Sequence, residues 1–136
     1  MKKKTIIWIF VLIFLAFMLF GVKYETTIYL GMSSPTSDGY SIDAEVKIDG
    51  ELITKDSINN NPYKYKMIKK KLGIGFRKVE VFSERADAYS VRTIFVLPAQ
   101  YLLLEFLPGI EMDDIDPKKY PPRFDIANGF NPFRYE

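Results

Sequence analysis

The sequence predicts an all-β fold, an antiparallel β-sandwich of about seven strands, preceded by one N-terminal transmembrane helix. Three observations lead to this prediction. An uninterrupted apolar segment occupies residues 5–22, and seven short runs rich in β-branched and aromatic residues follow it. Turn-forming residues separate these runs, and the dipeptide Asp49-Gly50 is the strongest hairpin signal among them.

The apolar segment has the length and composition of a membrane span. Thirteen of its 18 residues are Ile, Leu, Phe or Val, and none is charged. As a helix it is about 27 Å long and would enter a bilayer with a gain of about 4 to 8 kcal/mol. A cleavable signal peptide has a shorter apolar core and a nearby pair of small residues, whereas Gly31 and Ser33 lie far downstream. We therefore expect a retained signal anchor, with a removed signal peptide as the alternative.

The lysines at the N-terminus predict the orientation of this span. Lys2, Lys3 and Lys4 form a basic tip at residues 1–4, and positive flanks stay on the cytoplasmic side. The expected localisation is a single-pass membrane protein with a cytoplasmic N-terminus and a periplasmic or extracellular C-terminal domain. The chain has no cysteine for a disulfide or a lipid anchor, which fits a bacterial envelope protein.

Charge and composition exclude several classes of function. The chain has 19 basic and 17 acidic residues, so removing the three N-terminal lysines leaves 16 basic residues and a net charge near −1. This balance argues against nucleic acid as a partner. The absence of histidine and cysteine excludes His-based catalysis and the usual zinc and haem ligands. We therefore predict no catalytic residue, no cofactor, no metal and no enzymatic activity.

Residues 23–107 are expected to form one β-sandwich domain. In YSIDAEVKID, residues 40–49, apolar and polar residues alternate as in a half-buried strand. The other six strands are expected in YETTIYL, ELIT, YKYKMIKKKL, GFRKVEVFSE, YSVRTIFVLP and QYLLLEFLP. The predicted core consists of Val46, Ile48, Val79, Val81, Val91, Phe95, Leu102, Leu104 and Phe106. The runs VRTIFV and YLLLEF are apolar at adjacent positions, so the sequence does not decide whether these two strands are buried on one face or on both.

Two segments of the domain resemble the PEGA-type domain and its transthyretin-like relatives. The segment AEVKIDGELI contains a strand that ends in Asp-Gly, and GFRKVEV has the form Gly75-x-x-x-Val79-x-Val81. The resemblance covers about residues 42–107, and a longer segment, residues 56–72, separates the two parts here. It implies an immunoglobulin- or transthyretin-like extracytoplasmic sandwich that binds or acts as a spacer, and it implies no site residue.

Residues 108–136 form a different kind of segment, a C-terminal extension rich in proline and aromatic residues. It holds five of the eight prolines of the chain, and a disordered tail would be poor in aromatic residues. The extension is expected either to fold back over the sandwich or to dock on a partner protein. The candidate partner-binding residues are Tyr120, Arg123, Phe124, Phe130, Phe133 and Arg134. On the docking hypothesis, deletion of residues 117–136 leaves the sandwich folded and releases it from its partner.

Two charged clusters have a structural and a functional interpretation each. The candidate basic patch consists of Lys64, Lys66, Lys69, Lys70 and Lys71. It is expected to protect an edge strand, with binding of anionic glycans or lipid head groups as the alternative. The acidic cluster consists of Glu111, Asp113, Asp114 and Asp116. It lacks the glycine and the spacing of a calcium loop and is expected to be a solvated turn, with calcium binding through its carboxylate oxygens as the alternative.

The function predicted from these observations is that of an accessory or scaffolding subunit. The chain is expected to bind a larger membrane or envelope complex through its sandwich and its C-terminal extension, and the bilayer through residues 5–22. The alternative is a surface module that binds an anionic polymer or lipid head groups through the lysine-rich strand.

Overall fold

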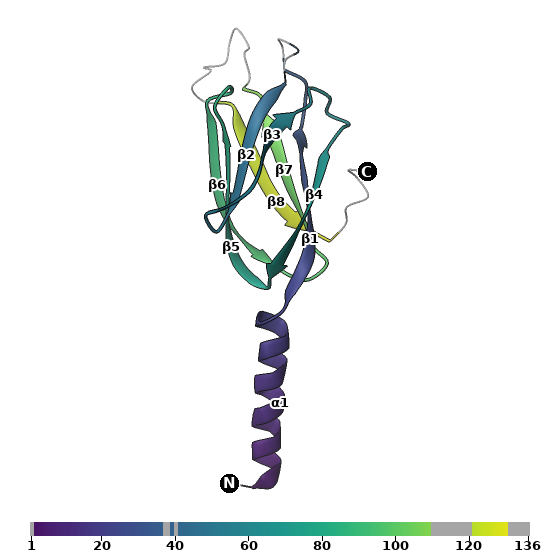
Figure 1. Cartoon of the computed structure of the whole chain (residues 1–136), viewed down its shortest axis with the longest axis vertical. Helices are drawn as coiled ribbons and strands as arrows, with labels where there is room; N and C mark the ends of the chain where they lie inside the picture. Colours follow the sequence, from purple (N-terminus) through teal and green to yellow (C-terminus); the bar gives the residue numbers. More distant parts are fainter. Residues whose placement is uncertain (1, 37–38, 40, 110–120, 131–136) are drawn as a thin grey trace.

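The computed structural model describes residues 2–36, 39, 41–109 and 121–130, which form one helix and two packed β-sheets (Figure 1). The helix α1, Lys3–Phe20, projects from one end of the sandwich and is followed by eight strands. These are β1 (Lys23–Met32), β2 (Ile42–Ile48), β3 (Glu51–Ile58), β4 (Lys66–Gly73), β5 (Gly75–Ser83), β6 (Ala88–Val96), β7 (Tyr101–Leu107) and β8 (Arg123–Gly129). The prediction of a β-rich sandwich behind an apolar helix is confirmed.

Each sheet has four strands. Sheet A has the order β4-β1-β7-β8, and sheet B has the order β3-β2-β5-β6. Sheet B is antiparallel throughout, but β1 and β7 of sheet A run parallel to each other. The prediction of a wholly antiparallel sandwich is therefore wrong for this pair. Parallel neighbours need a long connection, and here the whole of sheet B lies between β1 and β7 in the sequence.

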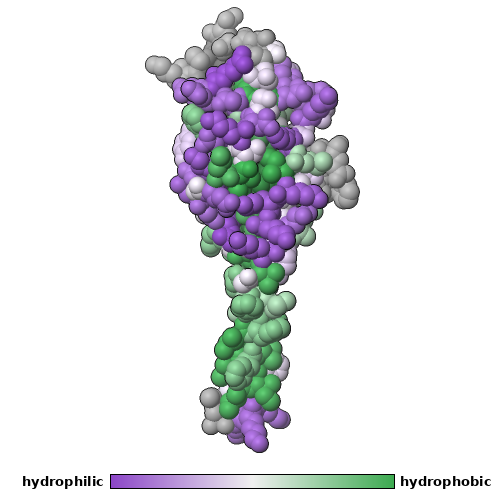
Figure 2. Space-filling model, viewed as in Figure 1, coloured by the Kyte–Doolittle hydropathy of each residue, from purple (hydrophilic) through white to green (hydrophobic). Residues whose placement is uncertain are grey.

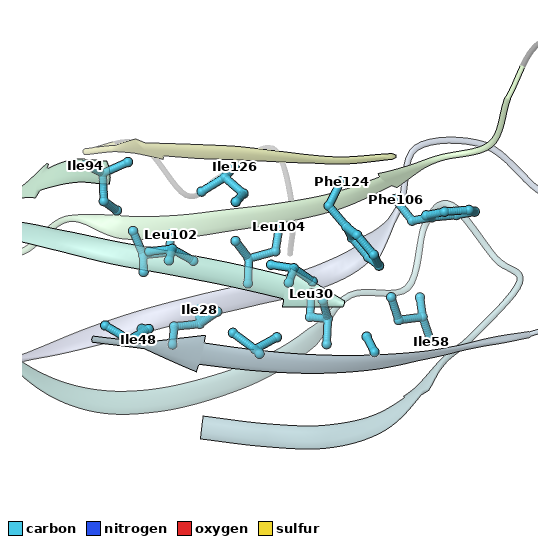
Figure 3. Close-up of a cluster of buried hydrophobic side chains, with 14 of the residues drawn as sticks. Ile28, Leu30, Ile48, Ile58, Ile94, Leu102, Leu104, Phe106, Phe124 and Ile126 are labelled. Atoms are coloured by element: carbon cyan, nitrogen blue, oxygen red, sulfur yellow. The ribbon is translucent and has the colours of Figure 1, made fainter. Parts of the chain in front are cut away.

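The core lies between the two sheets and takes alternate residues from their strands (Figure 3). On β2, every second residue from Ile42 to Ile48 is buried, because side chains of a strand point to opposite faces in turn. Of the predicted core, seven residues are buried: Val46, Ile48, Val79, Val81, Leu102, Leu104 and Phe106.

The other two residues of the predicted core, Val91 and Phe95, are on the solvent side of β6, where they are 49% and 41% exposed. Their neighbours Ile94 and Val96 point into the core instead. This part of the prediction is wrong because the run is apolar on both faces. Its inward face is set by the pairing of β6 with β5 in the assembled sheet.

Strand β8 lies in the predicted C-terminal extension and corrects the domain boundary at residue 107. It pairs with β7 from Tyr101↔Gly129 to Leu107↔Arg123 and forms one edge of sheet A. Phe124 and Ile126 of β8 are buried in the core. The prolines of the segment do not prevent this strand, because they flank it at positions 121, 122 and 132. The sandwich therefore includes Arg123–Gly129.

The hairpin predicted at Asp49-Gly50 is confirmed. These residues join β2 to β3 with φ angles of 51° and 82°, the left-handed geometry that a two-residue hairpin turn requires. Residues Ile48 and Glu51 pair directly across the turn.

Candidate functional site

The five lysines of the candidate basic patch lie in or next to β4, at the edge of sheet A. Three of them are paired with carboxylates: Lys66 with Asp56, Lys69 with Glu25 at 3.2 Å, and Lys70 with Glu51 at 2.6 Å. Lys64 and Lys71 are exposed, and neither forms an ion pair with another residue that the structure describes. Most of the positive charge of this strand is therefore balanced locally.

The pairs formed by Lys66 and Lys70 also connect the two sheets. Their carboxylate partners, Asp56 and Glu51, belong to β3, the edge strand of sheet B. The bond from Lys70 and its positive charge lower the pKa of Glu51. The lysines thus lie on an edge strand, and two of them link that edge to β3 across the side of the sandwich.

A cleft of about 430 Å³ lies beside these lysines, near the end of the sandwich that carries α1. Apolar residues in its wall are Ile48, Ile53 and Leu72, and the cations at its rim are Lys23, Lys70, Lys71 and Arg77. Asp49 and Glu51 bring two negative charges to the same rim. The cleft therefore has a positive excess that rests on Lys23 and Lys71.

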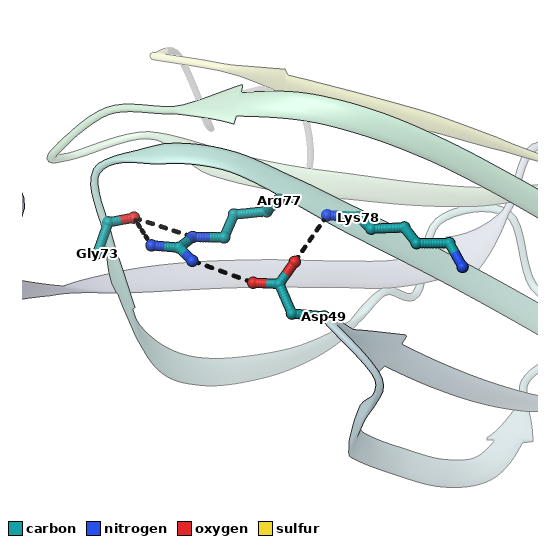
Figure 4. Close-up of polar contacts among 4 residues, drawn as sticks. All are labelled: Asp49, Gly73, Arg77 and Lys78. Atoms are coloured by element: carbon teal, nitrogen blue, oxygen red, sulfur yellow. Dashed lines mark hydrogen bonds and ion pairs between the residues drawn. The ribbon is translucent and has the colours of Figure 1, made fainter.

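Arg77 fixes one wall of this cleft (Figure 4). Its Nη1 atom lies 3.1 Å from Oδ2 of Asp49, and its Nε and Nη2 atoms donate to the carbonyl of Gly73 at 3.2 and 2.9 Å. The backbone N–H of Lys78 donates to Oδ1 of Asp49 at 2.9 Å. The guanidinium group therefore connects the β2–β3 hairpin to the end of β4.

The outer face of sheet B exposes a group of apolar side chains. Phe82 is 40%, Tyr89 is 58% and Val91 is 49% exposed. Phe82 pairs directly with Tyr89 across β5 and β6, and nearer to α1 Phe76 pairs with Phe95. A shallow depression of about 190 Å³ on this face is lined by Glu45, Lys47, Glu80, Phe82 and Tyr89. This exposed face was not predicted from the sequence.

Charges on the same face are paired among themselves. Glu80 accepts a hydrogen bond of 2.8 Å from the Tyr89 hydroxyl and lies 3.1 Å from Lys78, and these two contacts lower the pKa of Glu80. The bond to Glu80 raises the pKa of Tyr89. Glu45 lies 2.8 Å from Lys47, which lowers the pKa of Glu45 and raises that of Lys47. The face is therefore close to neutral, with aromatic rings between fixed ion pairs.

The sequence of β6 contains a pattern that indicates this exposed face, because successive residues of a strand point to opposite sides of the sheet. Tyr89, Val91, Thr93 and Phe95 share one face, and Ala88, Ser90, Ile94 and Val96 share the other. Both faces contain apolar residues, so the pattern indicates two contact surfaces without saying which is the core.

Of the candidate partner-binding residues of the extension, the structure describes Arg123, Phe124 and Phe130. Phe124 is only 4% exposed, with its ring 5.3 Å from that of Phe106, so its side chain belongs to the core and is not available to a partner. Arg123 is exposed, and Phe130 is 63% exposed. Tyr120, Phe133 and Arg134 lie outside the described residues, as does the acidic cluster of residues 111–116.

Among the described residues, no group of three or more His, Cys, Asp or Glu side chains is placed to hold a metal ion. Comparisons of the chain with protein-family models, with curated proteins and with solved structures found no match.

Proposed function

We propose that this protein is a non-catalytic, single-span envelope protein that serves as an accessory or scaffolding subunit of a larger membrane or envelope complex. In this proposal α1 is a retained anchor, the N-terminus is cytoplasmic, and the sandwich is periplasmic or extracellular. The sandwich contacts its partner protein through the outer face of sheet B, with the exposed residues of the C-terminal extension as additional contacts.

Two features of the structure bear on the helix: α1 has the surface of a membrane span, and the downstream cleavage site falls within the folded domain. Along its length α1 exposes apolar side chains, and Figure 2 shows it green where most of the visible sandwich surface is purple. Cleavage after Ser33, the downstream position that fits a signal peptidase, would remove β1. That strand lies between β4 and β7 and places Ile28, Leu30 and Met32 in the core. A domain cut there would lose a central strand.

The single observation that carries the proposal is the exposed aromatic face formed by Phe82, Tyr89 and Val91. When exposed apolar residues lie next to one another and are surrounded by polar residues, the surface is often a site of protein interaction. The paired charges around them resemble the polar rim of a protein interface and do not form the single-sign field that attracts a polyanion. We therefore place the main contact with a partner protein on this face.

A charge placed in this face tests the proposal. The full chain would be purified from its native membranes in mild detergent, and its assembly measured by native mass spectrometry. We expect wild type in a larger complex and Val91→Arg as a single chain. The matched control is Met67→Arg, because Met67 is 62% exposed on β4 of the opposite sheet, and it should retain the complex. Wild type that runs alone, or a Val91→Arg complex equal to wild type, would refute the proposal.

A second candidate function follows from the cleft beside β4. Lys23 and Lys71 give it a positive excess, so it could hold an anionic lipid head group or glycan. Binding by exposed lysines weakens steeply with ionic strength, whereas an aromatic contact does not. Two results would favour this candidate. The wild-type complex would dissociate in moderate salt, and the Lys71→Gln variant would fail to form the complex while Val91→Arg still forms it.

We also propose that the sandwich is related to PEGA-type and transthyretin-like domains. The support for this is local: the Asp-Gly hairpin and the Gly75-led strand, which carry the resemblance, lie next to each other. Asp49 bonds to the backbone of Lys78 through its main chain and its side chain, at 2.9 Å in each case.

A further inference from the structure

The end of the sandwich next to α1 differs in composition from the opposite end. We define the base as residues 21–24, 73–76 and 95–101, which are brought together by the pairs Lys23↔Gly73 and Gly75↔Val96. The base contains one lysine and no acidic residue. At the opposite end, the connection at residues 84–87 alone has three charged residues. The base itself is therefore mainly apolar, and the nearest carboxylates, Asp49 and Glu51, lie beside it on the rim of the cleft that Lys23 and Gly73 also line.

Several apolar side chains of the base are exposed in a fixed arrangement. Phe76 is 73% exposed, and its ring packs edge-on against Phe95 with the ring centroids 5.0 Å apart. Leu97 is 37% exposed, and Ala99 is exposed beside it with a φ angle of 61°. Gln100, itself almost buried, accepts a hydrogen bond of 3.0 Å from the backbone N–H of Leu97 through its side chain. This bond holds the turn so that its apolar side chains face outward.

The connection between α1 and β1 keeps this end at the membrane. Only Gly21 and Val22 separate the last residue of the helix from Lys23, the first of β1. The Tyr24 hydroxyl also donates to the carbonyl of Met18 in the helix at 3.1 Å. Figure 1 shows the helix directly below the base. If α1 spans the bilayer, the base lies at the level of the lipid head groups.

We propose that the base of the sandwich is a membrane-docking surface that rests on the outer leaflet of the bilayer. Phe76, Phe95, Leu97 and Ala99 enter the interfacial region, and Lys23 contacts lipid phosphates. Apolar side chains gain free energy at this depth, and the two carboxylates beside the base are neutralised locally, Asp49 by Arg77 and Glu51 by Lys70, so they repel anionic lipids little. This inference rests on the proposed function in one respect, which is that α1 is a retained anchor. Docking of the base would fix the orientation of the domain on the membrane and leave the outer face of sheet B accessible to a partner.

Spin labels on single cysteines test the inference directly, because the chain has no cysteine of its own. Leu97→Cys and Ala99→Cys would be labelled in the full chain, which is reconstituted in nanodiscs of phosphatidylcholine with a minority of phosphatidylglycerol. Accessibility to oxygen and to a water-soluble nickel chelate would then be measured. We expect a shift toward oxygen and away from nickel at both positions, as for groups immersed in lipid. Tyr63→Cys, at the opposite end and 90% exposed, should stay accessible to nickel.

A label at Leu12→Cys in α1 separates the two possible failures. If this label is in lipid while both base labels match Tyr63→Cys, the docking surface is refuted and the anchor stands. If the Leu12→Cys label is itself in water, the anchor fails, and the proposed function fails with it. Phe76→Ser should return the base labels toward nickel accessibility, whereas Phe82→Ser, on the same outer face but farther from α1, should not. Equal effects of these two substitutions would also contradict the inference.

Discussion

Asp43 organises the connection between β5 and β6 from its place at the start of β2. Its carboxylate accepts three hydrogen bonds, from the Ser83 hydroxyl at 2.9 Å and from the backbone N–H groups of Glu84 and Arg85 at 3.0 and 2.9 Å. Burial raises the pKa of Asp43, but the bonds from Arg85, Glu84 and Ser83 outweigh it and lower that pKa below its ordinary value. The ionised form therefore stabilises the fold.

Asp43→Asn should lower the free energy of unfolding by about 2 kcal/mol at neutral pH, the scale of hydrogen bonds to a charged group. Because the folded state has the lower pKa, this contribution is present above the unfolded pKa of about 4 and is lost as pH falls through the folded pKa. Urea unfolding of both proteins between neutral and acidic pH measures it. The two stabilities should converge in acid, and Asp87→Asn in the same connection should behave as wild type. A difference independent of pH would show that the charge is irrelevant.

Strand β8 connects the two sheets as well as forming an edge of sheet A. The backbone N–H of Phe124 donates to the Ser90 hydroxyl at 2.9 Å, and Arg92 donates to the carbonyl of Ile126 at 2.6 Å. Asn128 donates to the carbonyl of Phe95 at 2.8 Å. Ser90 and Arg92 of β6 thus bond through their side chains to the backbone of β8, and Asn128 of β8 bonds through its side chain to the backbone of β6. The edge of sheet A is joined to the edge of sheet B on this side.

Deletion of residues 117–136 should therefore unfold the domain or greatly lower its melting temperature, the reverse of what the docking hypothesis predicts from the sequence. The deletion removes a sheet edge and exposes the core residues that Phe124 and Ile126 cover. Thermal melting followed by circular dichroism measures the effect. A truncated chain that melts like wild type would show that β8 is dispensable.

Two single substitutions give a finer test of the same element. Phe124→Ala should cost about 3 to 5 kcal/mol, because it opens a cavity in the core. Phe130→Ala is the matched control, since Phe130 is 63% exposed just beyond the strand, and its effect should stay within about 0.5 kcal/mol. If the two variants have equal stability, the packing of β8 contributes little.

At the scale of the whole molecule, the main prediction concerns the N-terminus. We expect the protein isolated from membranes to retain residues 1–22, because α1 suits a bilayer and a cut after Ser33 would remove β1. Intact-mass measurement decides between the alternatives. A mass that corresponds to a start near residue 22 or 23 would identify α1 as a removed signal peptide and leave a soluble sandwich. A start near residue 34 would contradict the structure itself, since the domain would lack a central strand.

The sequence by itself determined the apolar helix, seven of the eight strands and the Asp49-Gly50 hairpin. Each of these depends on local chemistry: an uncharged span of membrane length, alternation or β-branched runs, and residues that tolerate a positive φ angle. The placement of the lysine-rich run in a strand followed from the same kind of local pattern. The eighth strand was missed because RFDIANG stands between prolines, in a segment whose high proline content argues against a regular strand.

Only the tertiary structure decided which faces are buried. VRTIFV and YLLLEF have the same kind of adjacent apolar residues, but β7 lies between β1 and β8, and Leu102, Leu103 and Leu104 are all buried there. β6 is an edge strand, and its Val91 and Phe95 remain exposed. A strand pattern fixes which residues share a face, whereas burial of that face depends on what packs against it from distant parts of the chain. The core, the aromatic face of sheet B and the apolar base therefore emerge only when the two sheets assemble.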